Sequence, residues 1–188
     1  MSDFPILTAD DAPEGSRQTL EAIKARVGMV PNILGVMAAS PAVLKTYAAI
    51  QGNWGEALLT PVEQQVAIIA IAAENGCTYC VPAHSMAAKK AGMDADTLAA
   101  LREGRDLPDP RHEALRTFAL AVVRRRGKVA DAEVQAFLDA GFTQAHILEV
   151  LLAAAQKTIT NYLNHMADVP LDGVFEPERW EVPAAAAE

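Results

Sequence analysis

The chain has 188 residues, of which 51% are apolar and only 5% aromatic, and its formal net charge is −8. This length suits one compact domain with a sizeable core. The acidic balance, without a basic stripe, disfavours nucleic acid as a partner. We find no transmembrane run and no basic and apolar signal region at the start, so we expect a cytoplasmic protein without membrane contact.

Helix start and stop signals recur along the whole chain, and we find no strand pattern. The sharpest start is Thr60-Pro61-Val62-Glu63, where Thr60 caps, Pro61 takes the first helical position and Glu63 completes a capping box. In chain order, helices are predicted at about 13–27, 41–57, 61–75, 77–91, 94–103, 111–126, 131–140 and 144–167, with a short apolar run at 33–39.

These signals predict an all-α fold. The segments 60–75 and 143–161 each begin with a threonine cap and carry a long apolar stretch, which suggests two related helical halves. Residues 66–73 are apolar on every side, so we expect this part of the first segment to be buried all round.

The stretch Gly76-Cys77-Thr78-Tyr79-Cys80-Val81-Pro82-Ala83-His84 contains the only two cysteines of the chain, with a histidine four residues after the second. On a helix, Cys80 and His84 share one face, so the imidazole can take the thiol proton and leave the nucleophilic thiolate. Cys77, one turn away, can attack whatever the first thiol has formed. In a reducing compartment a lone CxxC pair is typical of catalysis or metal binding rather than of a structural disulfide.

Several segments resemble those of the AhpD-like alkyl hydroperoxidases, which belong to the carboxymuconolactone decarboxylase superfamily. The matching segments are 31–34, 40–44, 59–65, 75–80 with 83–84, and 161–165, so the likeness spans roughly residues 28–172. We therefore expect a single AhpD-like domain over 1–188, with 173–188 as a tail that contains Trp180 and ends in an alanine run.

The resemblance implies a homo-oligomer, often a trimer or hexamer, that reduces organic hydroperoxides or hydrogen peroxide. No cofactor or metal is expected, and the reductant would be a dithiol partner such as a lipoylated or thioredoxin-type protein. By position in the family motif, Cys80 attacks the peroxide, Cys77 resolves the sulfenic acid as a disulfide, and His84 belongs to the proton relay.

The chain departs from the family at the relay carboxylate. The family often carries a glutamate twelve residues before the first cysteine, where this chain has Gln65. A glutamine can orient a water but cannot act as a base. Among the nearby carboxylates we favour Glu74 for the relay, because it lies three residues before Cys77, whereas the capping box accounts for Glu63.

Two further residues are candidates for the pocket or relay. Tyr79 lies between the cysteines, where it can line the pocket and donate a hydrogen bond or simply pack in the core. His165 ends the last long helix beside Asn161 and Asn164, and this polar face can approach the site from a second half or a neighbouring subunit.

Other functions fit parts of the motif. Cys77, Cys80 and His84 can supply three zinc ligands, with Glu74 or water as the fourth. A redox sensor would use the same disulfide to alter assembly without turnover. Decarboxylation of a lactone follows only from the superfamily name, and that chemistry has no need of a CxxC pair.

Overall fold

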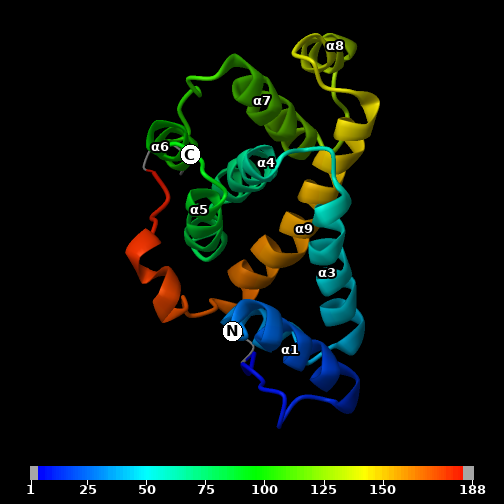
Figure 1. Ribbon diagram of the computed structural model, residues 1–188, viewed down its shortest axis with the longest axis vertical. Coiled ribbons are helices and arrows are strands. Elements are labelled where there is room, and N and C mark those ends of the chain that lie inside the picture. Colours follow the sequence, from blue (N-terminus) through cyan, green and yellow to red (C-terminus); the bar gives the residue numbers. More distant parts are fainter. Residues whose placement is uncertain (1–3, 184–188) are drawn as a thin grey trace.

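The computed structural model describes residues 4–183, and within this range every regular element is a helix, as predicted (Figure 1). The elements are α1 (Glu14–Val27), α2 (Asn32–Met37), α3 (Pro41–Asn53), η1 (Trp54–Glu56), α4 (Pro61–Glu74), α5 (Cys80–Lys90), α6 (Ala95–Glu103), α7 (Pro110–Arg124), α8 (Asp131–Asp139), α9 (Gln144–Ala167) and η2 (Gly173–Glu178).

Most helix ends lie within two residues of the prediction, but two helices are shorter by about one turn. The helix expected to reach residue 57 ends at Asn53 and tightens into η1, where Gly52 and Gly55 weaken the α-helix. The helix expected from residue 77 begins only at Cys80, because the chain first has to turn out of α4.

Helix α4 lies at the centre of the fold, packed against α5, α6, α7 and α9 (Figure 1). Residues 66–72 are all buried, which confirms the expectation from their apolar run. One apolar core joins α4 to α6, α7, α8 and the first half of α9. A second core joins α1, α2 and α3 to the start of α5, and both cysteines belong to this second core.

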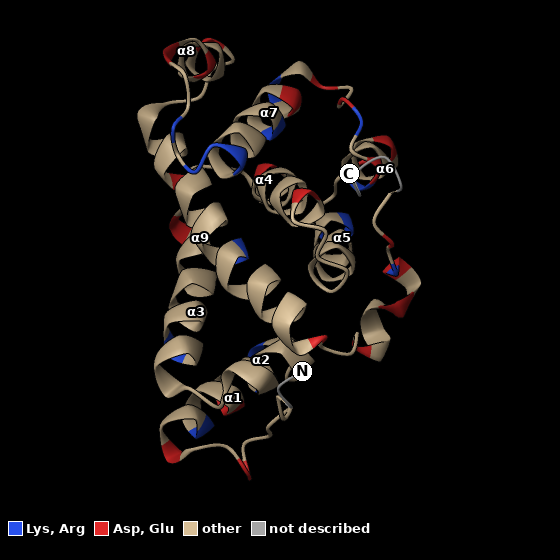
Figure 2. Cartoon of the chain, turned by 180° about the vertical axis from the view of Figure 1, so that it is seen from behind, with Lys and Arg blue, Asp and Glu red and all other residues tan. Residues whose placement is uncertain are grey.

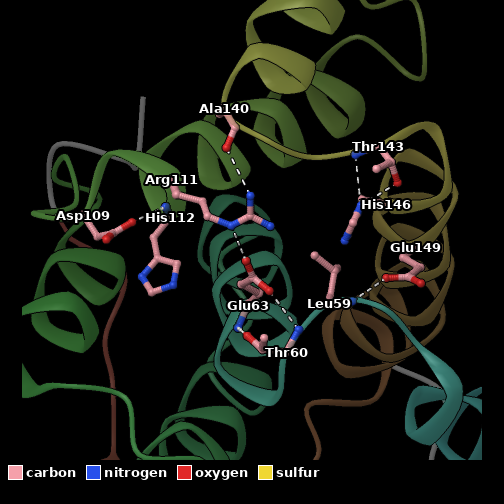
Figure 3. A network of polar contacts seen from close by, with 10 residues as sticks. All are labelled: Leu59, Thr60, Glu63, Asp109, Arg111, His112, Ala140, Thr143, His146 and Glu149. Carbon is pink, nitrogen blue, oxygen red and sulfur yellow. Dashed lines mark hydrogen bonds and ion pairs between the residues drawn. The ribbon is translucent and has the colours of Figure 1, made fainter.

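Helix α9 borders both cores and is nearly free of charge. Between Gln144 and Ala167 its only charged residues other than histidine are Glu149 and Lys157, and Figure 2 shows the helix tan over most of its length. Its start differs in detail from the prediction, because the Nδ1 of His146 accepts the Thr143 N–H at 3.0 Å while the Thr143 side chain makes no cap bond (Figure 3).

The segment expected as a tail after residue 172 packs on the fold as far as residue 183. Helix η2 lies against α5. Trp180 is buried, and its Nε1 donates to the carbonyl oxygen of Arg102 at 2.8 Å. The expected alanine run at 184–187 lies outside the described residues.

Over residues 4–183 no single helix is long and apolar enough to cross a membrane. Helices α8 and α9 pass that test of length and composition only when taken together, and they are bent by 112° at the break between them.

The start of α4 is held by a polar network at the end of the helix away from the cysteines (Figure 3). Glu63 accepts the Thr60 N–H at 2.8 Å while Thr60 Oγ1 accepts the Glu63 N–H at 3.2 Å, which confirms the capping box. Arg111 of α7 donates to Glu63 at 2.8 Å and to the carbonyl of Ala140 at 3.1 Å, and its guanidinium lies 3.8 Å from the centroid of the Phe142 ring. Glu63 therefore joins α4 to α7 and to the loop between α8 and α9.

We expect Glu63→Ala to destabilise the fold by about 2 kcal/mol, because it removes both a helix cap and the carboxylate partner of Arg111. For a chain of this length the melting temperature should then fall by roughly 4–8 °C. Thermal unfolding followed by circular dichroism measures this. Glu56→Ala, at an exposed carboxylate outside this network, is the matched control and should melt like the wild type; equal melting of both variants would contradict the role given to Glu63.

Candidate active site

The first cysteine is placed by the way α4 ends. Gly76 takes a left-handed conformation with φ 63°, which a side chain would strain. The Gly76 N–H then donates to the Ala73 carbonyl at 2.9 Å, and the Cys77 N–H donates to the Ala72 carbonyl at 2.9 Å. This pair of bonds is a Schellman motif, and it fixes the backbone of Cys77 against the end of α4.

The second cysteine is the first residue of α5. Both thiols are free, with Cys77 0% and Cys80 3% exposed. The Cys80 N–H donates to the Cys77 sulfur at 3.3 Å. Cys80 therefore lies at a helix N-terminus, where the dipole favours a thiolate, and Cys77 lies within reach of it.

A cavity of about 250 Å³ opens over Cys80. Its walls come from α1, α2, α3, α5, α9 and η2, and they are mostly apolar. Cys80, Tyr79 and His84 line it, whereas Cys77 is not among the lining residues. Of the two thiols, Cys80 is thus the one that a small molecule in the cavity meets.

His84 is held between two side chains. Its Nδ1 lies 2.9 Å from Gln65 Oε1, and its Nε2 lies 2.8 Å from Lys157 Nζ. An amide oxygen only accepts hydrogen bonds, so Nδ1 carries the ring proton and Nε2 accepts from the lysine. The structure therefore brings Gln65 to His84, so these two residues, which are 19 positions apart in the sequence, belong to one site.

Lys157 is the site residue that the sequence analysis missed. It is 0% exposed, it lines the cavity from α9, and it is the only Lys or Arg of that helix. A signal was present in the sequence: the buried polar side chains of α9 recur at helical spacing along an otherwise apolar helix. These residues are Gln156, Lys157, Thr160, Asn161 and Asn164.

The two cysteines ionise very differently. Burial raises the pKa of Cys80, but the Cys77 thiol, the charge of Lys157 and the side chains of Thr160 and Asn161 together outweigh it and lower the pKa to about 6. The hydrogen bond to Cys80 and burial both raise the pKa of Cys77 well above its ordinary value. At neutral pH, Cys80 is therefore the thiolate and Cys77 the thiol.

The charge that favours this thiolate comes from Lys157 and not from a histidinium. Burial, with a smaller effect of the nearby Lys157 charge, lowers the pKa of His84 well below its ordinary value. A neutral imidazole does not lower a neighbouring thiol pKa by its charge, and both of its ring nitrogens already have partners. The role of His84 is thus to position Lys157, and the imidazole itself brings no positive charge to the site.

Tyr79 both lines the cavity and joins the C-terminal segment to the site. Its hydroxyl donates to the buried carboxylate of Asp172 and accepts the Ile33 N–H at 3.4 Å. Its ring meets Phe175 of η2 edge to face, with centroids 6.1 Å apart. Burial and the Asp172 carboxylate raise the pKa of Tyr79, so it remains protonated and serves as a wall of the cavity.

Two other predicted residues lie elsewhere. Glu74 pairs with Arg124 of α7 at 2.6 and 2.7 Å and borders a second cavity, so its placement does not support a relay role. Glu74 lies nine positions after Gln65, which at 100° per residue puts the two side chains on opposite faces of α4. His165 is exposed on α9 and is not among the residues that line the cavity of Cys80 in this chain.

The zinc alternative is not supported by this geometry. Among the described residues, no three His, Cys, Asp or Glu side chains converge to hold a metal ion. Of the proposed ligands, His84 has both ring nitrogens occupied by Gln65 and Lys157, and Glu74 points to α7.

Comparison with known proteins gives one partial family match and several shared folds. Residues 41–109 match the carboxymuconolactone decarboxylase family. Over 93% of this chain the fold is similar to two peroxidase-related proteins: one from Ralstonia eutropha JMP134, described as an alkylhydroperoxidase AhpD core (23% identity, 94% of that chain, TM-score 0.81), and one from Silicibacter sp. TM1040 (21% identity, 92%, TM-score 0.78). The debrominase Bmp8 in complex with 2,3,4-tribromopyrrole is similar over 94% of this chain and 95% of its own (16% identity, TM-score 0.74). No curated protein sequence matches.

We expect Lys157→Met to raise the pKa of Cys80, because it removes the positive charge that favours the thiolate. Only the thiolate reacts, so the alkylation rate of Cys80 should fall as pH drops through about 6 in the wild type. In the variant this midpoint should lie higher by about one pH unit or more. The measurement is the pH dependence of iodoacetamide labelling, followed by mass spectrometry of the motif peptide.

Glu74→Gln is the matched control, since it removes a charge near the motif but on the opposite face of α4. It should leave the midpoint where the wild type has it. A midpoint that moves with Glu74→Gln and not with Lys157→Met would overturn the assignment of the charge to Lys157.

Proposed function

We propose that this protein is a thiol-dependent peroxidase in which Cys80 attacks and Cys77 resolves, an interpretation supported by the match of residues 41–109 to the carboxymuconolactone decarboxylase family and by the fold shared with an alkylhydroperoxidase AhpD core. One observation carries the proposal. The thiol that lines the cavity, Cys80, is the one whose pKa is lowered to about 6, and the thiol that stays protonated, Cys77, lies directly behind it.

The first step oxidises Cys80 and reduces the peroxide. The Cys80 thiolate attacks the distal oxygen of R–O–O–H, the O–O bond breaks, and the sulfenic acid and an alkoxide form. The alkoxide takes a proton and leaves as the alcohol R–OH. Lys157 is the cationic donor at the cavity, and its hydrogen bond to His84 holds it there.

The second step closes the disulfide. The Cys77 sulfur attacks the Cys80 sulfenic sulfur, an S–S bond forms, and the hydroxyl leaves as water with the Cys77 proton. An external dithiol, such as a lipoylated or thioredoxin-type protein, then reduces the disulfide by exchange. Such a reductant belongs to a reducing compartment, so this cycle suits the cytoplasm.

Gln65 makes this relay different from one that contains a carboxylate. A glutamate at that position would stabilise a charged imidazolium, whereas the neutral amide of Gln65 only fixes the tautomer of His84. In this chain the positive charge is therefore carried by Lys157. His84 and Gln65 hold the Lys157 side chain beside the Cys80 thiol.

A halogenated ring is a second candidate substrate, supported by the fold shared with the debrominase Bmp8 and by the apolar walls over Cys80. The same two thiols supply the electrons: R–Br and two thiols give R–H, one disulfide and HBr. Bromide release from 2,3,4-tribromopyrrole in the presence of a reductant tests this candidate directly.

We expect one equivalent of an organic hydroperoxide to consume two thiols in the wild type, with an equal loss of peroxide. Cys80→Ser should abolish peroxide consumption. Cys77→Ser should allow one turnover that stops at the Cys80 sulfenic acid, since no resolving thiol remains. Thiol titration, a peroxide assay and dimedone labelling of Cys80 measure these outcomes.

Turnover with an added dithiol separates an enzyme from a redox sensor, which would lose its thiols once and stop. Peroxide loss that persists in Cys80→Ser would sink the assignment of the nucleophile. If the wild type keeps its thiols and leaves the peroxide intact but releases bromide from the bromopyrrole, the peroxidase proposal is wrong and the protein is a dehalogenase.

We also propose that the chain assembles with copies of itself. Large apolar side chains repeat along the outer face of α9 and are exposed in the single chain, which is typical of a face that another subunit covers. They are Leu148, Leu151, Tyr162 and Met166. Light scattering after size exclusion should give the mass of a trimer or hexamer, and Leu151→Glu should lower it; Val174→Glu, at an exposed apolar residue of η2, is the control. A wild-type monomer would contradict this proposal.

A further inference from the structure

We propose that the cavity over Cys80 selects amphipathic anions: hydroperoxides with an apolar body and a carboxylate at the end away from the peroxide. This inference rests on the proposed peroxidase function and names the substrate class for the same site. It follows from how charge and apolar surface are distributed along the cavity.

The cavity follows one face of α5. Cys80, Ala83, Ala87 and Lys90 all line it, and their spacing of three or four residues puts them on a single side of the helix. From Cys80 to Lys90 the helix rises by about 15 Å. The cavity therefore has a reactive end at the start of α5 and a second end at its last turn.

The surface between these ends is apolar. Ile23 and Val27 of α1, Met86 of α5 and Phe175 of η2 contribute to the walls. A hydrocarbon chain or ring gains free energy by leaving water for such a surface. Hydrogen peroxide has no apolar part and gains nothing there.

Besides Lys157, two cations line this cavity. Lys90 lies in the last turn of α5 and Arg26 in the last turn of α1, and both line the cavity. Neither forms an ion pair or a side-chain hydrogen bond with any residue that the structure describes. Among the described lining residues there is no Asp or Glu, in a chain whose net charge is −8.

Helix dipoles alone do not account for this pair. A cation is favoured at any helix C-terminus, which explains why α1 and α5 end in basic residues. It does not explain why one cation from each helix borders the same apolar cavity while carboxylates are absent from its described lining. A carboxylate bound by these cations would give both of them a partner. The apolar body of the same molecule would then lie along the cavity and place its hydroperoxide at the Cys80 thiolate.

The test compares a medium-chain fatty acid that carries a terminal hydroperoxide with the methyl ester of the same acid. We expect wild-type kcat/KM to be about fivefold to tenfold higher for the acid, as two partly exposed ion pairs would give. Added salt should narrow the difference. The double variant Arg26→Ala/Lys90→Ala should lose the preference while its turnover of the ester and of hydrogen peroxide stays unchanged.

Lys24→Ala/Lys45→Ala is the matched control. It removes the same charge from exposed positions on α1 and α3 that do not line the cavity, and it should keep the preference for the acid. A preference that disappears equally in both double variants would show a general effect of net charge and overturn the proposal.

Binding of the unmodified fatty acid separates this proposal from the peroxidase itself. Calorimetry should show that the wild type binds the fatty acid more tightly than its methyl ester, and that Arg26→Ala/Lys90→Ala binds both equally. Equal binding by the wild type would overturn the anion site even if peroxide is reduced. Tighter binding of the acid without any peroxide turnover would support the anion site and overturn only the peroxidase.

Discussion

The charge of Lys157, buried beside Cys80, is the interaction on which the rest of the site depends. A lone ammonium without solvent is costly to bury, so it needs a partner that accepts its hydrogens and a negative charge close by. His84 supplies the acceptor at 2.8 Å, and the Cys80 thiolate supplies the charge. The three groups stabilise one another. The lysine favours the thiolate, the thiolate offsets the free-energy cost of burying the lysine charge, and the neutral imidazole holds the lysine in place.

The residues of the site come from the region of three helices, α4, α5 and α9, which meet only in the tertiary structure. Helix α4 ends in a left-handed turn at Gly76 that places Cys77, α5 begins at Cys80 and carries His84 one turn later, and α9 brings Lys157 across from the other side. Helix α4 also presents Gln65 to His84. Because α4 is anchored at its start by Glu63 and at its end by the turn at Gly76, its rotation is fixed, and Gln65 faces α5 while Glu74 faces α7 (Figure 3 shows the anchored start).

Local signals in the sequence predicted what is local in the structure. The capping box at Thr60, the buried run of α4 and the end of that helix near residue 75 all depend on neighbours within one or two turns, and each is found as expected. Lys157 was missed because its role depends on contact with a residue 73 positions away. Glu74 lies only three residues before Cys77, but its side chain meets Arg124 of α7, because helical phase and not closeness in sequence sets the direction of a side chain. The packing of the segment after residue 172 likewise depends on a distant carbonyl, that of Arg102.

The same charge arrangement bears on how the proposed disulfide would be reduced. Oxidation converts the Cys80 thiolate into a neutral disulfide and leaves Lys157 buried without its negative partner. Reduction restores that partner, so the environment stabilises the dithiol form relative to the disulfide. A protein whose reduced form is stabilised in this way is the more oxidising member of a thiol exchange. The lysine that lowers the pKa of Cys80 for the attack therefore also favours transfer of electrons from an external dithiol. Attack on the peroxide and reduction of the disulfide thus both depend on the one buried charge of Lys157.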